Sequence, residues 1–154
     1  MNQQSIRDLI ASSFEGVEVT VASRGNGAPE ASWGDTFFIC DPHHDLPEQK
    51  QFPFATIVTQ DYGDFDKRSN LDRPGVFRLN VGVSKETFDA LFPSVEGFDF
   101  AALDQLMPHP VYGPNHWVCV LNPSEATFES VKPLLTEAYA IARGRADNVH
   151  ERHA

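Results

Sequence analysis

The chain has 154 residues, of which 22 are acidic and 12 are basic, so its formal net charge at pH 7 is −10. Nucleic-acid binding depends on Lys and Arg side chains that neutralise phosphates, so this acidity argues against a nucleic-acid partner and, for the same reason, against an anionic membrane surface. No apolar run is long enough to span a bilayer, and the polar start of the chain lacks the apolar segment of a signal peptide. We therefore expect a cytoplasmic protein.

The length fits one domain, and the content of 41% hydrophobic residues, with 12 Phe among them, is enough for one core. We expect a single α+β domain over residues 1–146 and a charged, frayed tail over residues 147–154. Cys40 and Cys119 lie in apolar, strand-like surroundings far apart in the sequence. Two buried, reduced thiols are expected there rather than a disulfide.

The first half of the chain predicts one helix and three strands. Asn2 is a good helix cap, apolar residues recur after it at helical spacing, and Gly16 is suited to end that helix. Runs rich in β-branched and aromatic residues predict strands at Val17–Val21, Thr36–Cys40 and Phe54–Thr59. Polar stretches that contain Gly and Pro connect them.

The segment Asp61–Gly75 is the longest stretch without periodicity. A loop of that length in a compact domain is usually functional or mobile. It leads into a fourth predicted strand, Val76–Val83, whose apolar side chains fall on one face while Arg78 and Asn80 fall on the other. If helices cover the apolar face, these two polar side chains point to the open face or into a cleft.

The remaining elements are predicted from caps and periodicity. Ser84 is expected to cap a helix, and Phe100–Leu106 is expected to form a second, short one. A strand follows at Trp117–Leu121, and Ser130 is expected to cap the last helix with Pro133 in its first turn.

The predicted order is therefore helix, four strands, two helices, strand, helix. Consecutive strands joined by loops imply an antiparallel sheet, and helices gathered at the two ends of the chain would cover one face of it. The predicted fold class is α+β, an antiparallel sheet with helices packed on one face.

Two resemblances support this class. The helix Lys85–Leu91, the strand Trp117–Leu121 and the final segment Leu134–Tyr139 occur in an order that resembles the MmcQ/YjbR-like family of small bacterial proteins. That resemblance implies a single α+β domain with an antiparallel sheet and helices on one side. The resemblance brings no established activity. It suggests DNA binding only by analogy of fold, and the acidity of this chain opposes that function.

A closer resemblance covers nearly the whole chain. The strand Phe77–Asn80, the turn Pro108–Tyr112 and the pair Trp117-Val118 resemble a mainly actinobacterial family of unknown function. This resemblance implies no activity, so the function has to be argued from the residues themselves.

The turn Pro108–Tyr112 is the most distinctive local feature, because two prolines fix the backbone on either side of His109. A rigid mount suits a functional histidine, although a turn whose imidazole only bonds a carbonyl is the commoner arrangement. Arg78 offers a planar donor fork for a carboxylate or phosphate, or else an ion pair with an acid such as Asp61 or Asp72.

We hypothesise that this turn, the polar strand face and the long loop border one cleft. The candidate ligand-binding residues are Arg78, Asn80, His109, Tyr112, Trp117 and Asp61. An anion would sit on Arg78 while His109 exchanges a proton with it.

No metal or cofactor is predicted. The aspartates of the long loop do not match a calcium loop, since Arg68, Ser69 and Gly75 stand where ligands or the turn glycine belong. Histidines and an aspartate could in principle meet around zinc, but their spacing matches no zinc motif: His43, His44, Asp45, His109 and His116. No glycine-rich phosphate loop and no nucleophile elbow is present.

The leading hypothesis is a non-catalytic module, a monomer or weak homodimer, that binds a small anionic molecule or a protein. The alternative is a small enzyme that uses His109 as acid or base with Arg78 as anion anchor. A concave pocket that holds both side chains would favour a site there, and a flat acidic face would exclude it.

Overall fold

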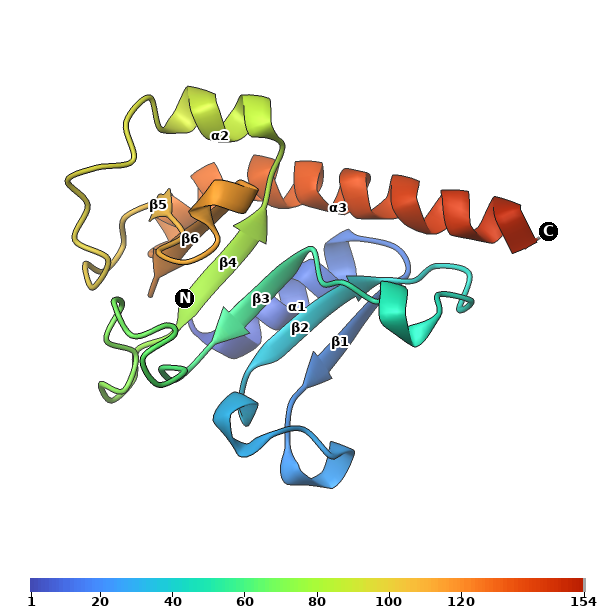
Figure 1. The fold of residues 1–154 in the computed structure, drawn as a ribbon, viewed down its shortest axis with the longest axis horizontal. Helices are drawn as coiled ribbons and strands as arrows, with labels where there is room; N and C mark the ends of the chain where they lie inside the picture. Colours follow the sequence, from blue (N-terminus) through green and yellow to red (C-terminus); the bar gives the residue numbers. More distant parts are fainter. Residues whose placement is uncertain (154) are drawn as a thin grey trace.

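The computed structural model describes the backbone of residues 1–153 and the side chains of residues 1–152. They form a six-stranded antiparallel sheet with the strand order β1-β2-β3-β4-β6-β5, together with three α-helices (Figure 1). The helices are α1 (Gln3–Ser13), α2 (Lys85–Leu91) and α3 (Glu125–His153). The strands are β1 (Val17–Val21), β2 (Thr36–Cys40), β3 (Ala55–Val58), β4 (Arg78–Gly82), β5 (Met107–Pro108) and β6 (Trp117–Leu121).

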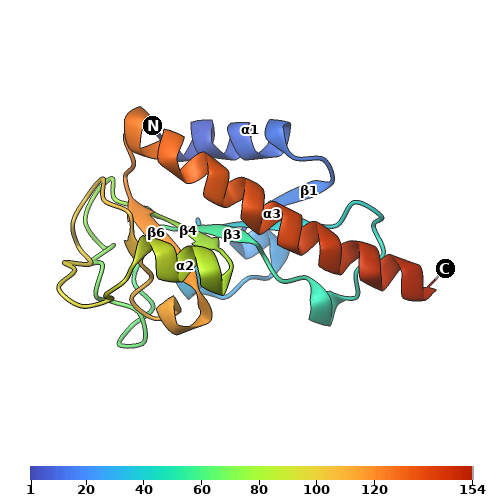
Figure 2. The same ribbon diagram turned by 90° about the horizontal axis from the view of Figure 1, so that it is seen from above.

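Helices α1 and α3 lie together on one face of the sheet (Figure 2). Alternation along the strands sends every second side chain to that face, where a single buried core forms. From the sheet it includes Phe38, Ile57, Leu79, Val81, Val118 and Val120, and from the two helices Ile6, Ile10, Phe128, Val131, Leu135 and Ala138. The predicted α+β class, with an antiparallel sheet and its main helices on one face, is confirmed.

The opposite face is covered by loops over its β4–β6 half. A smaller apolar cluster forms there from Val58, Leu71, Met107, Cys119 and Leu121. Arg78 and Asn80 share this face, so the long loop encloses them instead of leaving them open to solvent. Both cysteines are buried free thiols, as expected.

Helix α3 is far longer than the strands beneath it. Its 29 residues span about 43 Å, whereas a five-residue strand spans about 17 Å. Its C-terminal half therefore extends past the sheet (Figure 1). Within residues 1–153, no helix combines the length and hydropathy needed to cross a membrane.

The overhanging half of α3 is covered by the segment of residues 41–54, which contains the short 3-10 helix η3 (Glu48–Lys50). Two histidine–aspartate contacts join them, His43 Nε2 to Asp147 Oδ1 and His150 Nδ1 to Asp45 Oδ2, each 2.7 Å. The two imidazole rings stack with centroids 3.9 Å apart. This cover accounts for the burial of apolar residues near the end of α3.

Several predicted boundaries need correction. Phe100–Leu106 is not helical, because Asp104 takes a left-handed conformation there (φ 59°) and the segment folds onto the sheet as an irregular loop. It runs into the two-residue strand β5, which sequence patterns did not reveal. Helix α3 begins at Glu125, not after Ser130, so Pro133 lies inside the helix.

The start of α3 is set by Ser124, whose Oγ accepts a hydrogen bond from Thr127 N at 3.2 Å. The residues expected to fray from position 147 onward continue α3 as far as His153, and residue 154 lies outside the described part. Asn2 and Ser84 cap α1 and α2 as predicted.

The helix–sheet core gives a direct test of the fold. Leu135 is 1% exposed and belongs to this core, so Leu135→Ala should lower the free energy of unfolding by about 2–5 kcal/mol through lost apolar contact and a residual cavity. Urea denaturation would measure it. The exposed neighbour Thr136→Ala should change it by less than about 0.5 kcal/mol, and equal effects of the two substitutions would contradict the assigned helix face.

Candidate functional site

Arg78 lies at the centre of a buried polar network. Its side chain is fully buried, and its guanidinium donates to both carboxylate oxygens of Asp66, at 3.0 and 2.6 Å. It also donates to Ser69 Oγ at 2.9 Å and to Asn80 Oδ1 at 2.8 Å. A bidentate pair of this kind satisfies a buried guanidinium almost completely. Arg78 therefore has its anion already, supplied by the long loop.

His109 closes the network from the Pro108–Tyr112 turn. Its Nδ1 accepts hydrogen bonds from the amides of Val111 and Tyr112, at 3.0 and 2.9 Å. Because an amide can only donate, Nδ1 carries no proton, and the neutral ring holds its proton on Nε2. Nε2 lies 3.1 Å from Arg78 Nη2, which is also a donor, so this contact is not a stabilising hydrogen bond.

These surroundings keep His109 neutral. Burial and, next, the Arg78 charge lower its pKa to about 3, while the Asp66 charge opposes the shift. An imidazole with that pKa is not a proton donor near neutral pH. Burial likewise raises the pKa of Cys119 to about 12 and that of Cys40 to about 11, so neither thiol is a ready nucleophile.

The long loop is held against the sheet by further buried polar contacts. Asp35, fully buried at the start of β2, accepts hydrogen bonds from Thr59 N and from the Tyr62 hydroxyl. Asp61 does not reach the network, because its Oδ1 accepts from Leu71 N within the loop at 2.9 Å. The expectation that Arg78 pairs with Asp61 or Asp72 is thus corrected: Asp66 is the partner.

The structure brings together some, but not all, of the residues predicted to bind a ligand. Arg78 contacts both Asn80 and His109. The Tyr112 ring lies 5.1 Å from the His109 ring, but the residue is 44% exposed. The expected convergence of turn, strand face and loop is present. The expected open cleft is not, since Asp66 and Ser69 fill the space beside Arg78.

Trp117 lies elsewhere, in a groove of about 580 Å³ under the overhanging half of α3. We call this cavity the α3 groove. Its volume falls within the range of about 300–1,000 Å³ typical of small-molecule sites. Its walls come from the 41–54 segment, the ends of β4 and β6, and α3. Charged, aromatic and small residues line it, among them Lys50, Phe52, Gly82, Lys85, Trp117, Arg145, Val149 and Arg152.

The charges that line the α3 groove all have one sign. Four of the 12 basic side chains of the chain lie there, Lys50, Lys85, Arg145 and Arg152, and no Asp or Glu lines it. Lys85 pairs with Asp89 at 2.7 Å. In the described part of the chain, the other three have no hydrogen-bond or ion-pair partner. A protein of net charge −10 thus leaves free cations in this one concavity.

The floor of the groove is aromatic and apolar. Trp117 lies directly opposite Gly82 across the β4–β6 ladder. A Cβ on Gly82 would come within 3.1 Å of the indole atoms Cε2 and Cζ2, so a larger residue would push the ring away by a few tenths of an ångström, and glycine lets it lie close across the strand. Phe52 stands at the rim and is 72% exposed. The arrangement offers a planar surface beside positive charge.

A second concavity, of about 820 Å³, lies between α1 and α3. Its basic residues are already paired, Lys132 with Glu129 at 2.7 Å and Arg143 with Asp147 at 3.1 Å. It therefore lacks the free positive charge of the α3 groove, and we take the α3 groove as the candidate site.

Apart from Trp117, the groove residues were not identified from the sequence, although one signal was present. Arg145 and Arg152 are seven residues apart, two helical turns, and so they share a face with Val149. These residues line a groove only because α3 is long enough to extend past the sheet. The sequence pattern predicted a shorter helix, so it did not predict the groove.

Fold and groove together define a single-sheet α+β domain with a cationic cavity of ligand size. A model of a family of unknown function, DUF6194, matches residues 1–152, and the chain belongs to that family. No curated protein and no solved structure matches the chain. The expectation of a family of unknown function is confirmed. Because that family has no known function, a function has to be inferred from the groove itself.

The buried ion pair can be tested by removing one partner. Asp66→Asn should lower the free energy of unfolding by about 3–5 kcal/mol, because it leaves the Arg78 charge buried without compensation. Asp64→Asn, two residues away with an exposed carboxylate, should change it by less than about 0.5 kcal/mol. Equal small losses in both variants, measured by urea denaturation, would contradict the buried pair.

His109 should make stability depend on pH. The pKa of a histidine is near 6.5 in the unfolded chain, and the folded value is lower, so its contribution is complete above pH 6.5 and is lost as the pH falls toward 3. His109→Asn keeps an acceptor for the two amides but does not titrate. Between pH 7 and pH 5, the native protein should lose about 2 kcal/mol more unfolding free energy than this variant.

Urea denaturation of both proteins at the two pH values gives that difference. Carboxylates are the same in both proteins, so their effect on the unfolding free energy cancels. A His109 imidazole that titrates near pH 6–7 in NMR spectra of the folded protein would contradict the assignment.

Proposed function

We propose that the protein binds a small organic anion with a planar or apolar body in the α3 groove. The observation that carries this proposal is the charge of the cavity: four basic residues and no acidic ones, in a chain of net charge −10. Basic side chains grouped beside an apolar floor, with no acid among them, create a positive potential that attracts an anion. A ligand with a negative charge and an apolar body would interact with both the basic residues and the apolar floor.

The ligand class follows from the lining. A carboxylate, sulfonate or phosphate would accept charge-assisted hydrogen bonds from Arg145 or Arg152, because the guanidinium fork can donate to two oxygens of one anion. An aromatic or apolar body would lie against Trp117 and Phe52. Phe52 is exposed at the rim, so a bound ligand would give its ring a partner.

The alternative of a small enzyme built on His109 and Arg78 receives less support. Both side chains are buried and have their partners within the chain, and His109 does not take up a proton near neutral pH. We infer that Asn80, His109, Arg78 and Asp66 serve to hold the turn and the long loop on the sheet. Binding without chemistry is the simpler role for the groove.

We further propose that the fold is of the MmcQ/YjbR-like type and that the protein is bacterial and cytoplasmic. The antiparallel sheet with α1 and α3 on one side supports the first proposal. DNA binding, which the fold analogy suggests, is opposed by the net charge of −10, because a phosphate backbone is bound by an excess of Lys and Arg.

Isothermal titration calorimetry with a panel of aromatic anions and their neutral isosteres tests the proposal. The leading pair is 2-naphthoate and 2-naphthamide, which differ in charge but hardly in shape. The carboxylate should bind with 1:1 stoichiometry and about tenfold or more tighter than the amide, because a charge-assisted hydrogen bond contributes about 1.5–3 kcal/mol. Its affinity should fall as salt is added.

Two variants show whether binding occurs in the groove. Arg145→Gln should weaken 2-naphthoate about tenfold or more, whereas Arg24→Gln, an exposed arginine outside the groove, should leave it unchanged. Equal affinity for acid and amide, or no saturable binding by any anion of the panel, would refute the proposed function.

A further inference from the structure

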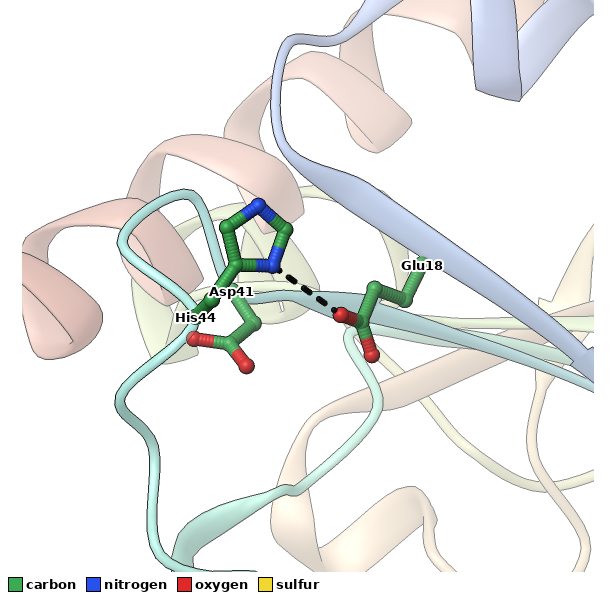
Figure 3. Close-up of side chains that lie close together, drawn as sticks. All are labelled: Glu18, Asp41 and His44. Carbon is green, nitrogen blue, oxygen red and sulfur yellow. Dashed lines mark ion pairs between the residues drawn. The ribbon is translucent and has the colours of Figure 1, made fainter.

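Three side chains that can ligate a metal meet at the edge of the sheet, away from both the buried network and the α3 groove. They are Glu18, Asp41 and His44, and one ligand atom from each lies within 4.8 Å of the other two (Figure 3). Glu18 and His44 are exposed, while Asp41 is buried, with 4% of its surface exposed.

The sheet explains why these residues meet. Glu18 of β1 pairs with Ile39 of β2, so Asp41, two residues further along, is its diagonal neighbour on the same face. The turn after β2 brings His44 back, with His44 N donating to Asp41 O at 3.2 Å. A Cβ on Gly16 would come within 2.5 Å of Pro42 Cβ, so glycine is required where this turn packs on β1.

The buried carboxylate of Asp41 is poorly compensated. Its Oδ1 accepts one long hydrogen bond, from Leu46 N at 3.3 Å. Among residues 1–152, no donor reaches its Oδ2 and no Lys or Arg pairs with it. This oxygen is not enclosed by the protein, so it is free to bind a further ligand such as a metal ion.

The spacing of the other two atoms suits a shared metal ion. His44 Nδ1 and Glu18 Oε1 lie 3.4 Å apart and form no hydrogen bond. Two ligands bound tetrahedrally at about 2.0–2.2 Å lie about 3.4 Å from each other. The dashed line in Figure 3 marks this contact, with the Asp41 carboxylate beside it.

We propose that Glu18, Asp41 and His44 form a binding site for a divalent transition-metal ion of the zinc type. One imidazole nitrogen with two carboxylates suits borderline cations, whereas Mg²⁺ and Ca²⁺ prefer oxygen ligands alone. Three protein ligands leave a coordination position for water or a partner's group. The ion would bind the turn of residues 41–44 to β1 and so steady the segment that forms one wall of the α3 groove.

The site is tested on the full chain, stripped with EDTA, by titration with Zn²⁺ in a calorimeter at pH 7.5. We expect one saturable site per chain. Glu18→Gln and His44→Ala, both at exposed positions, should each weaken it about tenfold or more. Zn²⁺ should also raise the melting temperature of the native protein but not of His44→Ala, because binding stabilises only the folded state.

Two controls separate this site from other zinc-binding groups of the chain. Glu48→Gln removes an exposed acid and His116→Ala removes a histidine of the α3 groove, and neither should change the affinity. A site that survives His44→Ala, or the lack of any saturable site up to millimolar Zn²⁺, would overturn the proposal.

Discussion

The length of α3 is the constraint on which the rest of the structure depends. A 29-residue helix on five-residue strands must overhang the sheet, and an overhanging apolar stripe needs a cover. The segment of residues 41–54 provides that cover through two histidine–aspartate contacts and the burial of Val149. Because a loop closes over a helix less completely than a sheet does, a groove remains between them, and the basic residues of the helix line it.

Arginine side chains occupy two contrasting environments in this protein. On the loop-covered face of the sheet, Arg78 donates to both carboxylate oxygens of Asp66 and to Ser69. Its charge is therefore neutralised within the chain, without a ligand. In the α3 groove, Arg145 and Arg152 face a cavity without such partners in the described part of the chain. Loss of either partner would destabilise the first arrangement, and the second is the basis of the affinity for an anion that we propose.

Local patterns predicted much of the fold and little of the site. Three strands, β1, β2 and β6, have the expected bounds, because each is a run rich in β-branched and aromatic residues that ends at a turn signal. The start of α3 was misplaced because proline at position 133 suggested a helix start, whereas the packed helix tolerates it. The partner of Arg78 was one of several aspartates in an aperiodic loop, and only the folded loop selects Asp66. Glu18 and His44 likewise meet only through sheet register.

The central claim is that the α3 groove receives an aromatic anion. The chain has two tryptophans, of which Trp117 lines the groove and Trp33 donates its indole N–H to Ala28 O, away from it. Proton–nitrogen NMR spectra recorded during titration with 2-naphthoate follow both indole signals in one sample. The account predicts that the Trp117 signal shifts saturably while the Trp33 signal stays in place. A Trp117 signal that does not respond, or a Trp33 signal that moves equally, would contradict it.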